Sequence, residues 1–363
     1  MPKTHQEYWL ALKFVPRLAV HKKLALVETH GLINLFQSLE LINNCQLTAN
    51  QRSAFAHPNW TNIGKIITES LSCQSEIVCF DDQRYPKLLK EIYDPPLVLF
   101  IQGDSKLLNQ TQIAIVGSRS ATISGRDNAG KFAYQLVEHD FVITSGMALG
   151  IDAAAHRGAL QAQGKTIAVV ATGLDKVYPS RHKLLSQEIL QSGGLIVSEF
   201  VPGTLPKAGH FPKRNRIISG LSQGVLVVEA EIKSGSLITA RCALEQGREV
   251  FAIPGSVNNP LAKGCHWLIK QGALLIDNAT DIVEELTVLD NQAPTKKNKE
   301  NNYQQDLFND PLLASVEYEV TPIDIVVSRT ILPVEVVLTR LTMLELKGQV
   351  VAVPGGYIRL NRG

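Results

Sequence analysis

Between residues 112 and 287, short apolar runs alternate with segments in which apolar residues recur at helical spacing. The runs, rich in Val and Ile, read QIAIVG, FVITSG, TIAVVAT, GLIVSEF, GVLVVEA, EVFAIPG and GALLI. Segments such as GIDAAAHRGALQAQ and SLITARCALEQG lie between them. Runs that are apolar at nearly every position are typical of strands covered by helices on both faces. The pattern predicts an α/β domain with a doubly wound, mostly parallel sheet.

The flanking segments have different patterns. Residues 1–75 place apolar residues at three- and four-residue spacing, which predicts an N-terminal helical domain. The stretch YPKLLKEIYDPPLVLFIQGD, which starts at residue 85, predicts a helix, a Pro-Pro stop and a strand. We therefore expect the α/β domain to span residues 80–287. Residues 288–311 are polar and have no period, which predicts a flexible linker.

Residues 312–363 return to regular patterns. TPIDIVVSRT and PVEVVLTRLTMLELKG predict two helices, and QVVAVPGGYIRL predicts a hairpin that turns at Gly355-Gly356. Two helices and a hairpin in a short segment are typical of a winged helix. The candidate recognition helix carries as many acids as bases: Glu335, Glu345, Arg340 and Lys347. A net-neutral helix is a poor DNA reader, so we expect it to serve protein contact or packing.

Composition and charge narrow the class of protein. Hydrophobic residues make up 45% of the chain and charged residues 19%, which is typical of a globular protein with a large core. The formal net charge is only +2, so any basic surface for a polyanion must be local. The five cysteines form no CxxC pair, and no apolar run is long enough to span a bilayer. We expect reduced thiols and a cytoplasmic protein that has no membrane partner.

Glycine-rich loops follow the first two predicted strands of the α/β domain. In a doubly wound sheet, ligands bind beyond the carboxyl ends of the strands, and glycines let the backbone approach an anion closely. Neither loop matches the dinucleotide fingerprint GxGxxG, and GALQAQGKT has the wrong spacing for a phosphate-binding P-loop. The alternative is that these glycines only form tight turns. The candidate anion-binding residues in the two loops are Gly117, Ser118, Arg119, Ser145, Gly146 and Gly150.

The stretch HFPKRNRIISGLS, at residues 210–222, is a stronger candidate. Its cations Lys213, Arg214 and Arg216 precede the apparent helix RIISGLS, at the positive end of the helix dipole, which favours a compensating anion. Phe211 offers a face for base stacking. One alternative is a solvated turn with Phe211 in the core, and another is that the arginines hold loops together. The next loop, AEIKSGSLITAR, brings Lys233 and Ser236 towards the same sheet edge.

Catalytic and metal-binding patterns are weak in this sequence. Asp152 and His156 are four residues apart on one face of a predicted helix, so His156 could be a base paired with Asp152, but we expect an exposed capping pair at the helix start. We find no nucleophile–base–acid set and no cysteine or histidine cluster at metal-ligand spacing. The residues therefore predict neither a catalytic site nor a metal or other cofactor.

Seven consecutive blocks resemble the DNA-processing protein A family (DprA, also called Smf). They are YPKLLKEIYDPPLVLFIQGD, IAIVGSRSATISG, SGMALGIDAAAHRGAL, TIAVVATGLDKVYP, SEFVPGTLPKAGHFPKRNRIISGLS, VVEAEIKSGSLITA and GREVFAIPGS. The resemblance implies an extended Rossmann-like domain that binds single-stranded DNA, with a SAM-like helical module before it and a winged helix after it. It also implies a non-catalytic homodimer that protects incoming strands and loads a RecA-type recombinase onto them during natural transformation.

Family motifs carry over to particular positions of this chain. They imply strand contacts by Arg119, Phe211, Lys213, Arg214 and Arg216, with Asn215 beside them. Gly146 and Gly150 would line the pocket, and Lys176 would be peripheral. The N-terminal stretch VPRLAVHKKLALVETHG lacks the glycines of a DNA-binding hairpin between helices, so we do not expect strand contacts by that route.

A nucleotide-processing enzyme is the alternative function. Related Rossmann-like proteins cleave nucleoside monophosphates as phosphoribohydrolases, with a PGGxGTxxE-like loop that supplies a carboxylate. This chain has EAEIKSGSLITARCALE at that place, and its only PGG lies in the C-terminal hairpin. The sequence therefore favours strand binding over nucleotide cleavage.

Overall fold

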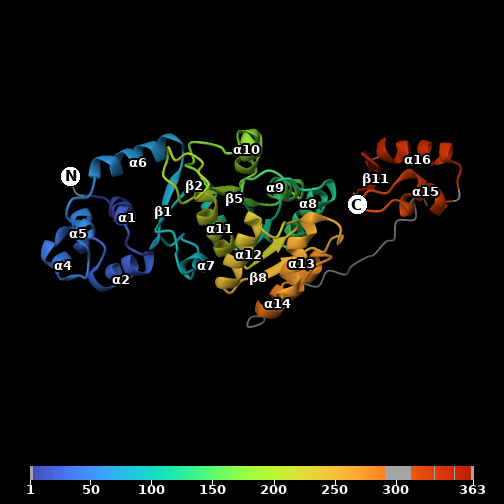
Figure 1. Ribbon diagram of the computed structural model, residues 1–363. Coiled ribbons are helices and arrows are strands. Elements are labelled where there is room, and N and C mark those ends of the chain that lie inside the picture. Colours follow the sequence, from blue (N-terminus) through green and yellow to red (C-terminus); the bar gives the residue numbers. More distant parts are fainter. Residues whose placement is uncertain (1–2, 291–311, 331, 347, 361–363) are drawn as a thin grey trace.

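The computed structural model describes residues 3–290, 312–330, 332–346 and 348–360 (Figure 1). The N-terminal segment is helical, as its periodicity predicts. Its first helix is fixed by a capping box, in which Thr4 and Glu7 satisfy each other's backbone N–H groups. Trp9 and Phe55 are buried at its centre. The helices are α1 (His5–Phe14), α2 (Val20–His30), α3 (Asn34–Gln37), α4 (Leu39–Asn44), α5 (Ala49–Ala56) and α6 (Trp60–Ser72).

A nine-stranded sheet forms the centre of the described chain, and its strand order is β1-β2-β6-β5-β4-β3-β7-β8-β9. All neighbouring strands from β6 to β9 are parallel, whereas β2 pairs antiparallel with both β1 and β6. This confirms the predicted doubly wound, mostly parallel sheet. The strands are β1 (Glu76–Cys79), β2 (Val98–Gly103), β3 (Gln112–Val116), β4 (Val142–Ser145), β5 (Thr166–Val170), β6 (Leu195–Ser198), β7 (Gly224–Val227), β8 (Glu249–Ala252) and β9 (Leu274–Leu275).

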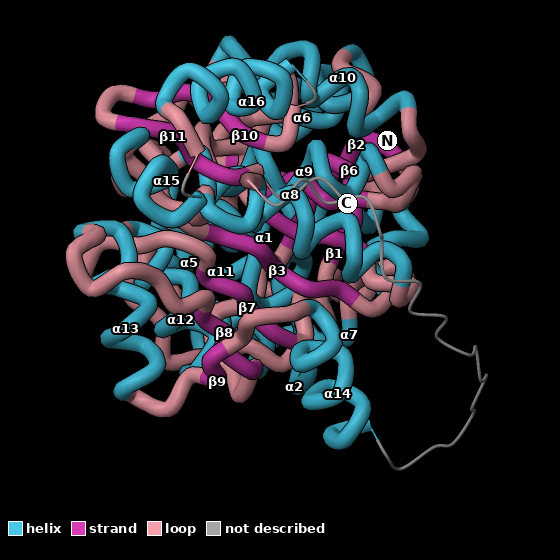
Figure 2. Tube along the Cα trace, turned by 90° about the vertical axis from the view of Figure 1, so that its right-hand side faces the viewer, coloured by secondary structure: helices cyan, strands magenta, loops and turns pink. Residues whose placement is uncertain are grey.

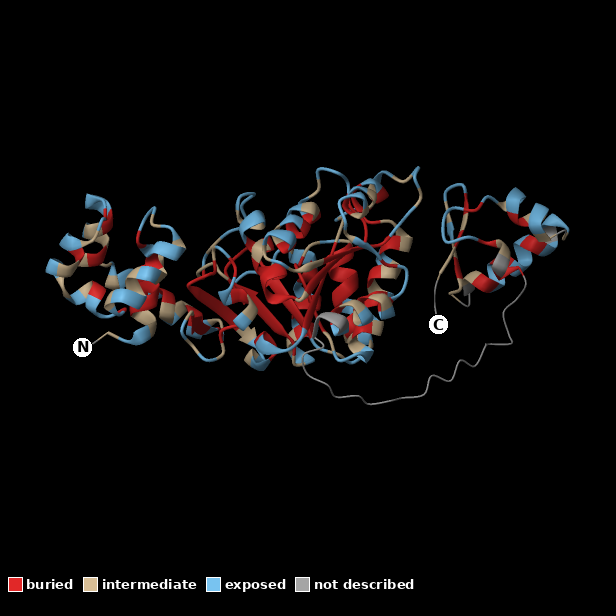
Figure 3. Ribbon diagram, turned by 90° about the horizontal axis from the view of Figure 1, so that it is seen from below, coloured by how far each residue is buried: buried red, intermediate tan, exposed pale blue. Residues whose placement is uncertain are grey.

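Helices cover both faces of this sheet (Figure 2), which explains why most strands are apolar throughout. Figure 3 shows the strands as the most buried part of the molecule. Side chains of α7 (Lys87–Lys90), α11 (His210–Leu221), α12 (Gly235–Glu245) and α13 (Lys263–Lys270) pack on one face. The other face is covered by α8 (Ile123–Glu138), α9 (Ile151–Gln161), α10 (Lys183–Gln191) and α14 (Ala279–Asp290).

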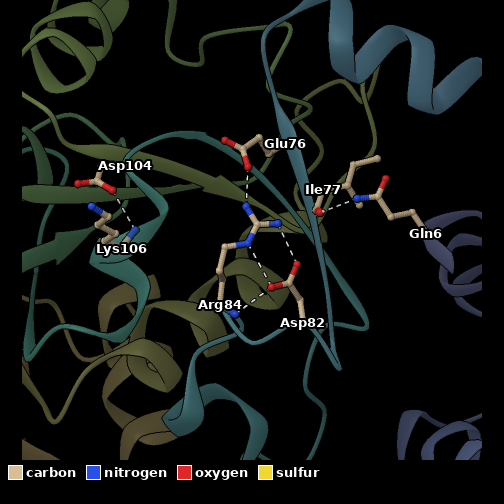
Figure 4. Close-up of polar contacts among 7 residues, drawn as sticks. All are labelled: Gln6, Glu76, Ile77, Asp82, Arg84, Asp104 and Lys106. Carbon is tan, nitrogen blue, oxygen red and sulfur yellow. Dashed lines mark hydrogen bonds and ion pairs between the residues drawn. The ribbon is translucent and has the colours of Figure 1, made fainter.

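The N-terminal helices are joined to the β1 edge of the sheet by a continuous apolar core and by polar contacts (Figure 4). Gln6 of α1 donates to the carbonyl of Ile77 in β1 at 3.2 Å. Beyond β1, Arg84 donates to Asp82 at 2.8 Å and to Glu76 at 2.5 Å. The Arg84 guanidinium therefore fixes the turn between β1 and α7. The hydrogen bond of Gln6 and the shared apolar core attach the N-terminal helices to the sheet.

The C-terminal segment has the predicted helix–helix–hairpin order, with α15 (Ile323–Thr330), α16 (Val334–Leu346), β10 (Val350–Val353) and β11 (Gly356–Arg359). The turn differs from the prediction by one residue, because Gly356 pairs with Val353 and the turn is Pro354-Gly355. Helix α14 also extends into the predicted linker, as far as Asp290. The rest of that linker lies outside the described residues.

Among the described helices, none combines the length and the apolar character that a bilayer span requires. All five cysteines are free thiols, as expected, and Cys79 and Cys265 are buried. Burial raises the pKa of the Cys265 thiol to about 12, so this thiol stays protonated at neutral pH.

Candidate nucleic-acid interface

An open cavity of about 420 Å³ lies where the loops after β3, β4 and β7 meet the start of α11. The chain runs from β3 to β6 on one side of β3 and then continues with β7 on its other side. Such a switch in strand order leaves a crevice at the carboxyl ends of the strands. The predicted site residues that line this cavity are Gly117, Ser118, Arg119, Phe211, Arg214, Asn215 and Ser236.

Two glycines hold the loop after β3 against its neighbours. The Ser118 N–H donates to the carbonyl of Glu229, and the Ile151 N–H at the start of α9 donates to the carbonyl of Ser118, at 2.7 and 3.2 Å. Gly150 has φ +78°, and a Cβ there would collide with the carbonyl of Ser118. A Cβ on Gly117 would meet the Ile151 side chain at 2.6 Å. These glycines permit the close approach that positions Arg119.

Glu229, which the sequence analysis did not single out, fixes the same loop from the end of β7. Its buried carboxylate accepts from the Thr122 N–H at 2.9 Å and from the Thr122 hydroxyl at 2.6 Å. Thr122 in turn caps α8 by accepting from the Gly125 N–H. A buried carboxylate that is hydrogen-bonded in this way supports the loop.

Helix α11 begins at His210, so the cations of HFPKRNR lie within its first two turns and do not precede it. This corrects the expectation of a helix that starts at Arg216. Pro212 stands in the first turn, where a missing N–H leaves no helical hydrogen bond unmade. The side chains of Phe211, Arg214 and Asn215 share one face and line the cavity.

Arg214 is buried, with 5% of its surface exposed, and it forms part of the cavity wall. It donates to the carbonyl of Val169 at 2.7 Å and to the side-chain oxygen of Asn215 at 3.1 Å. Burial raises the pKa of the nearby Asp152 carboxyl, and the charge of Arg214 opposes that rise. Gly146 packs on this pair, because a Cβ there would collide with the Arg214 guanidinium. Arg214 is therefore both a wall of the cavity and a structural cation.

Arg119 and Phe211 form the exposed side of the cavity. The guanidinium of Arg119 lies over the Phe211 ring, 5.0 Å from its centroid. Tyr178, whose ring centroid is 6.0 Å from that of Phe211, extends this surface into a recess of about 90 Å³ that Met147 and Leu149 also line. Tyr178 was not among the predicted strand contacts, although it lies two residues after Lys176 in the GLDKVYP block. A cation and two rings on one surface suit phosphate contact and base stacking.

The structure separates other predicted residues from this cavity. The Ser145 hydroxyl is buried and donates to the carbonyl of Ile115 at 2.6 Å. Gly146 and Gly150 lie behind the lining and support it. Lys176 and Lys233 are exposed but do not line the cavity.

Arg216 and Lys213 lie on the other side of α11, away from the cavity. Arg216 forms ion pairs with Glu199 at 2.7 Å and with Asp94 at 3.2 Å. The alternative that this arginine holds loops together therefore fits the structure better than a solvent-facing cation. The exposed Lys213 beside it has no such pair among the described residues.

The expectation of an exposed capping pair at Asp152 and His156 is wrong, because both side chains are buried. His156 is hydrogen-bonded to the Gly146 carbonyl at 2.6 Å and to the Thr166 hydroxyl at 2.7 Å. Burial lowers the pKa of His156 to about 4, so the imidazole is neutral and joins α9 to the neighbouring strands. Across the described residues, His, Cys, Asp and Glu side chains form no cluster that could hold a metal ion.

Two family profiles match the chain. The family described as DNA recombination-mediator protein A matches residues 76–287, and the DprA winged helix domain matches residues 303–356. Protein Smf of Escherichia coli (strain K12) is 49% identical over 288 residues, which are 78% of this chain and 76% of that protein. DNA processing protein DprA of Streptococcus pneumoniae is 50% identical over 204 residues, which are 56% of this chain and 72% of that protein.

Solved structures share the same architecture. The X-ray structure of DNA processing protein A from Streptococcus pneumoniae has a TM-score of 0.68 and 39% identity, and the match covers 78% of this chain and 99% of that one. A structure of DNA processing protein A from Helicobacter pylori, reported for its single-stranded DNA binding mode, has a TM-score of 0.53 and 34% identity. That match covers 59% of this chain and 96% of the other.

Proposed function

Because the chain belongs to the DNA recombination-mediator protein A family, we propose that it binds single-stranded DNA without catalysis, in the cavity at the carboxyl ends of β3, β4 and β7. The observation that carries the proposal is the Arg119–Phe211 pair at the mouth of that cavity. Single-strand binders combine cations that follow the backbone with aromatic faces on which bases stack, and this pair supplies one of each.

The shape and position of the cavity support a single strand over a duplex. The cavity is open and lies among loops at a sheet edge. Of the described helices that line it, α11 and α12 pack on the sheet, so neither is free to enter a major groove. The neighbour from Helicobacter pylori, whose structure was reported for its single-stranded DNA binding mode, supports the same substrate. We expect little sequence preference, because stacking and phosphate contacts do not distinguish bases.

The carboxylates near the cavity support binding over nucleotide cleavage. Asp152 and Glu231 are the acidic residues among its described lining. Asp152 is buried, accepts from the Ala148 N–H at 3.2 Å and lies under the influence of the structural cation Arg214, so its role in the cavity wall is structural, and Glu231 is an exposed carboxylate. Incubation of the pure protein with a panel of nucleoside monophosphates tests this point, and rapid release of free base would contradict it.

The wider role that we propose follows from the family resemblance. In this role the protein is a cytoplasmic homodimer that protects incoming strands and loads a RecA-type recombinase onto them during natural transformation. Relatives named DNA processing protein DprA support a role in DNA processing. A strand-exchange assay with a RecA-type recombinase and a single-strand-binding protein tests loading. The expected result is faster exchange when this protein is added.

The direct test of strand binding is a titration of the full chain with a labelled single strand and with a blunt duplex of the same length. We expect the single strand to bind more tightly and its affinity to fall as salt rises, because phosphate contacts release counterions. Equal affinity for the duplex would contradict the proposal.

A further inference from the structure

Helix α11 separates the cavity from a second groove of about 580 Å³. We call this the α1–α11 groove, because it lies between the end of α1, the loop after β6 and the start of α11. His210, Lys213 and Arg216 line it, whereas Phe211 and Arg214 line the cavity. Residues three apart share a helix face, so successive residues of α11 point to two different binding surfaces.

The α1–α11 groove carries uncompensated positive charge. Its two carboxylates are both engaged by Arg216 in the ion pairs described above. Lys13 at the end of α1, Lys207 before α11 and Lys213 on α11 also line the groove. Among the described residues, none of these three lysines has an ion-pair partner. Burial lowers the pKa of Lys13, so the free charge of the groove comes mainly from the exposed Lys207 and Lys213. Two exposed lysines that converge from separate parts of the chain favour a polyanion.

Aromatic rings also line this groove, together with two residues that each carry a buried, unpartnered nitrogen. Arg216 Nη1 and His210 Nδ1 are buried and have no hydrogen-bond partner among the described residues. The His210 ring stacks on Phe200 with the centroids 4.4 Å apart. Phe14, at the end of α1, lines the groove with 43% of its surface exposed. The exposed Phe14 ring suits a base.

We propose that a single strand held in the cavity continues across the first turns of α11 into the α1–α11 groove. There Lys207 and Lys213 contact its phosphates and Phe14 stacks a base. The inference rests on the proposed single-strand binding and extends its path. Because a helix with its side chains is only about 10–12 Å across, the strand has a short distance to cover. The N-terminal helices thereby contribute to strand binding through the end of α1, without a glycine hairpin.

Strand length provides the test, because only a long strand reaches both surfaces. In the full chain, Lys207 and Lys213 are both replaced by Ala. Both are exposed, so the fold should tolerate the change. For a long oligothymidine, we expect weaker binding and a slope of log affinity against log salt that falls by about 1.4, or about 0.7 for each lost phosphate contact. For the shortest oligothymidine that the wild type binds, we expect affinity and slope to be unchanged.

A matched control removes two exposed lysines elsewhere, with Lys131→Ala on α8 and Lys183→Ala on α10. This control should bind both strands like the wild type. Phe14→Ala tests the contribution of α1. It should lower the affinity for the long strand by at least about fivefold, with little change in salt slope, because stacking releases few ions.

The outcomes separate this inference from the proposed function. If the wild-type chain binds no single strand, both the proposed function and this inference are wrong. If the Lys207→Ala/Lys213→Ala variant binds the long strand like the wild type, the inference about the α1–α11 groove is wrong, but the proposed function is not affected. Equal losses for short and long strands would also overturn the inference, because the lysines would then act at the cavity itself.

Discussion

Replacement of Arg214 by Met should destabilise the protein before it changes any DNA contact. Arg214 is 5% exposed, its guanidinium donates to the Val169 carbonyl, and its charge opposes the rise that burial causes in the pKa of Asp152. Its removal leaves the buried Val169 carbonyl without its donor and the buried Asp152 carboxyl without the nearby cation, which should lower the free energy of unfolding by about 2–5 kcal/mol. Urea denaturation, followed by circular dichroism, should show a loss of this size.

A double-mutant cycle identifies the cause of that loss. Asp152→Asn removes the buried charge but keeps an oxygen that can accept from the Ala148 N–H. In the Arg214→Met background it should recover about 1–3 kcal/mol, the coupling expected for neighbouring groups. The control Arg119→Met removes an exposed guanidinium from the same cavity and should change the free energy of unfolding by less than about 0.5 kcal/mol. This account of Arg214 would be refuted if the free energy of unfolding of Arg214→Met lay within about 1 kcal/mol of the wild-type value. It would also be refuted if the effects of the two substitutions were additive in the double mutant.

Three further predictions concern binding and pH. Arg119→Ala should lower the salt slope by about 0.7, whereas Phe211→Ala should lower affinity by about 1–3 kcal/mol with an unchanged slope; equal slope changes in a fluorescence titration would count against this assignment. Truncation after residue 290 should leave single-strand affinity within tenfold of the full chain, because we propose that the α/β domain binds without the winged helix; a larger loss would show otherwise. His156, with its pKa lowered to about 4 by burial, is neutral when folded but binds a proton below about pH 6.5 when unfolded, so its contribution to stability falls with falling pH, by about 2 kcal/mol between pH 7 and 5. In urea denaturation, the free energy of unfolding of His156→Gln should fall less between pH 7 and 5 than that of the wild type. An equal fall in both proteins would contradict a lowered pKa for His156.

The strands of the sheet could be predicted because their burial on both faces leaves a direct pattern in the sequence. A strand covered on both faces must be apolar throughout, and β3 and β5 are buried at every position. The short edge strand β1 was missed, since EIVC has neither the length nor the flanking signals of the others. Edge position and short length weaken the hydrophobic pattern on which such predictions depend.

The start of α11 was misplaced because the local sequence looks unlike a helix. Pro212 and the cations around it are typical of a turn, yet proline is compatible with the first turn of a helix. This shift of helix start changes which side chains share a face. It moves Lys213 and Arg216 away from the cavity and keeps Phe211 and Arg214 in it.

The partners of the buried charges could not be predicted from local sequence. The charge of Arg214 acts on Asp152 of α9, and Arg216 pairs with Glu199 and Asp94, all of which are distant in the chain. Which arginine is exposed and which is paired depends on tertiary packing. The motif could therefore indicate that cations gather at this sheet edge, but not which of them remain free for a ligand.

Photocrosslinking tests the central claim most directly. A single strand that carries 5-bromouracil is bound to the full chain and irradiated, and the crosslinked peptides are identified by mass spectrometry. The account predicts crosslinks at the aromatic surface of the cavity, on Phe211 or Tyr178, and their loss when excess unlabelled single strand competes. Crosslinks confined to the winged helix, with none on the loops after β3, β4 and β7 or on α11, would contradict it.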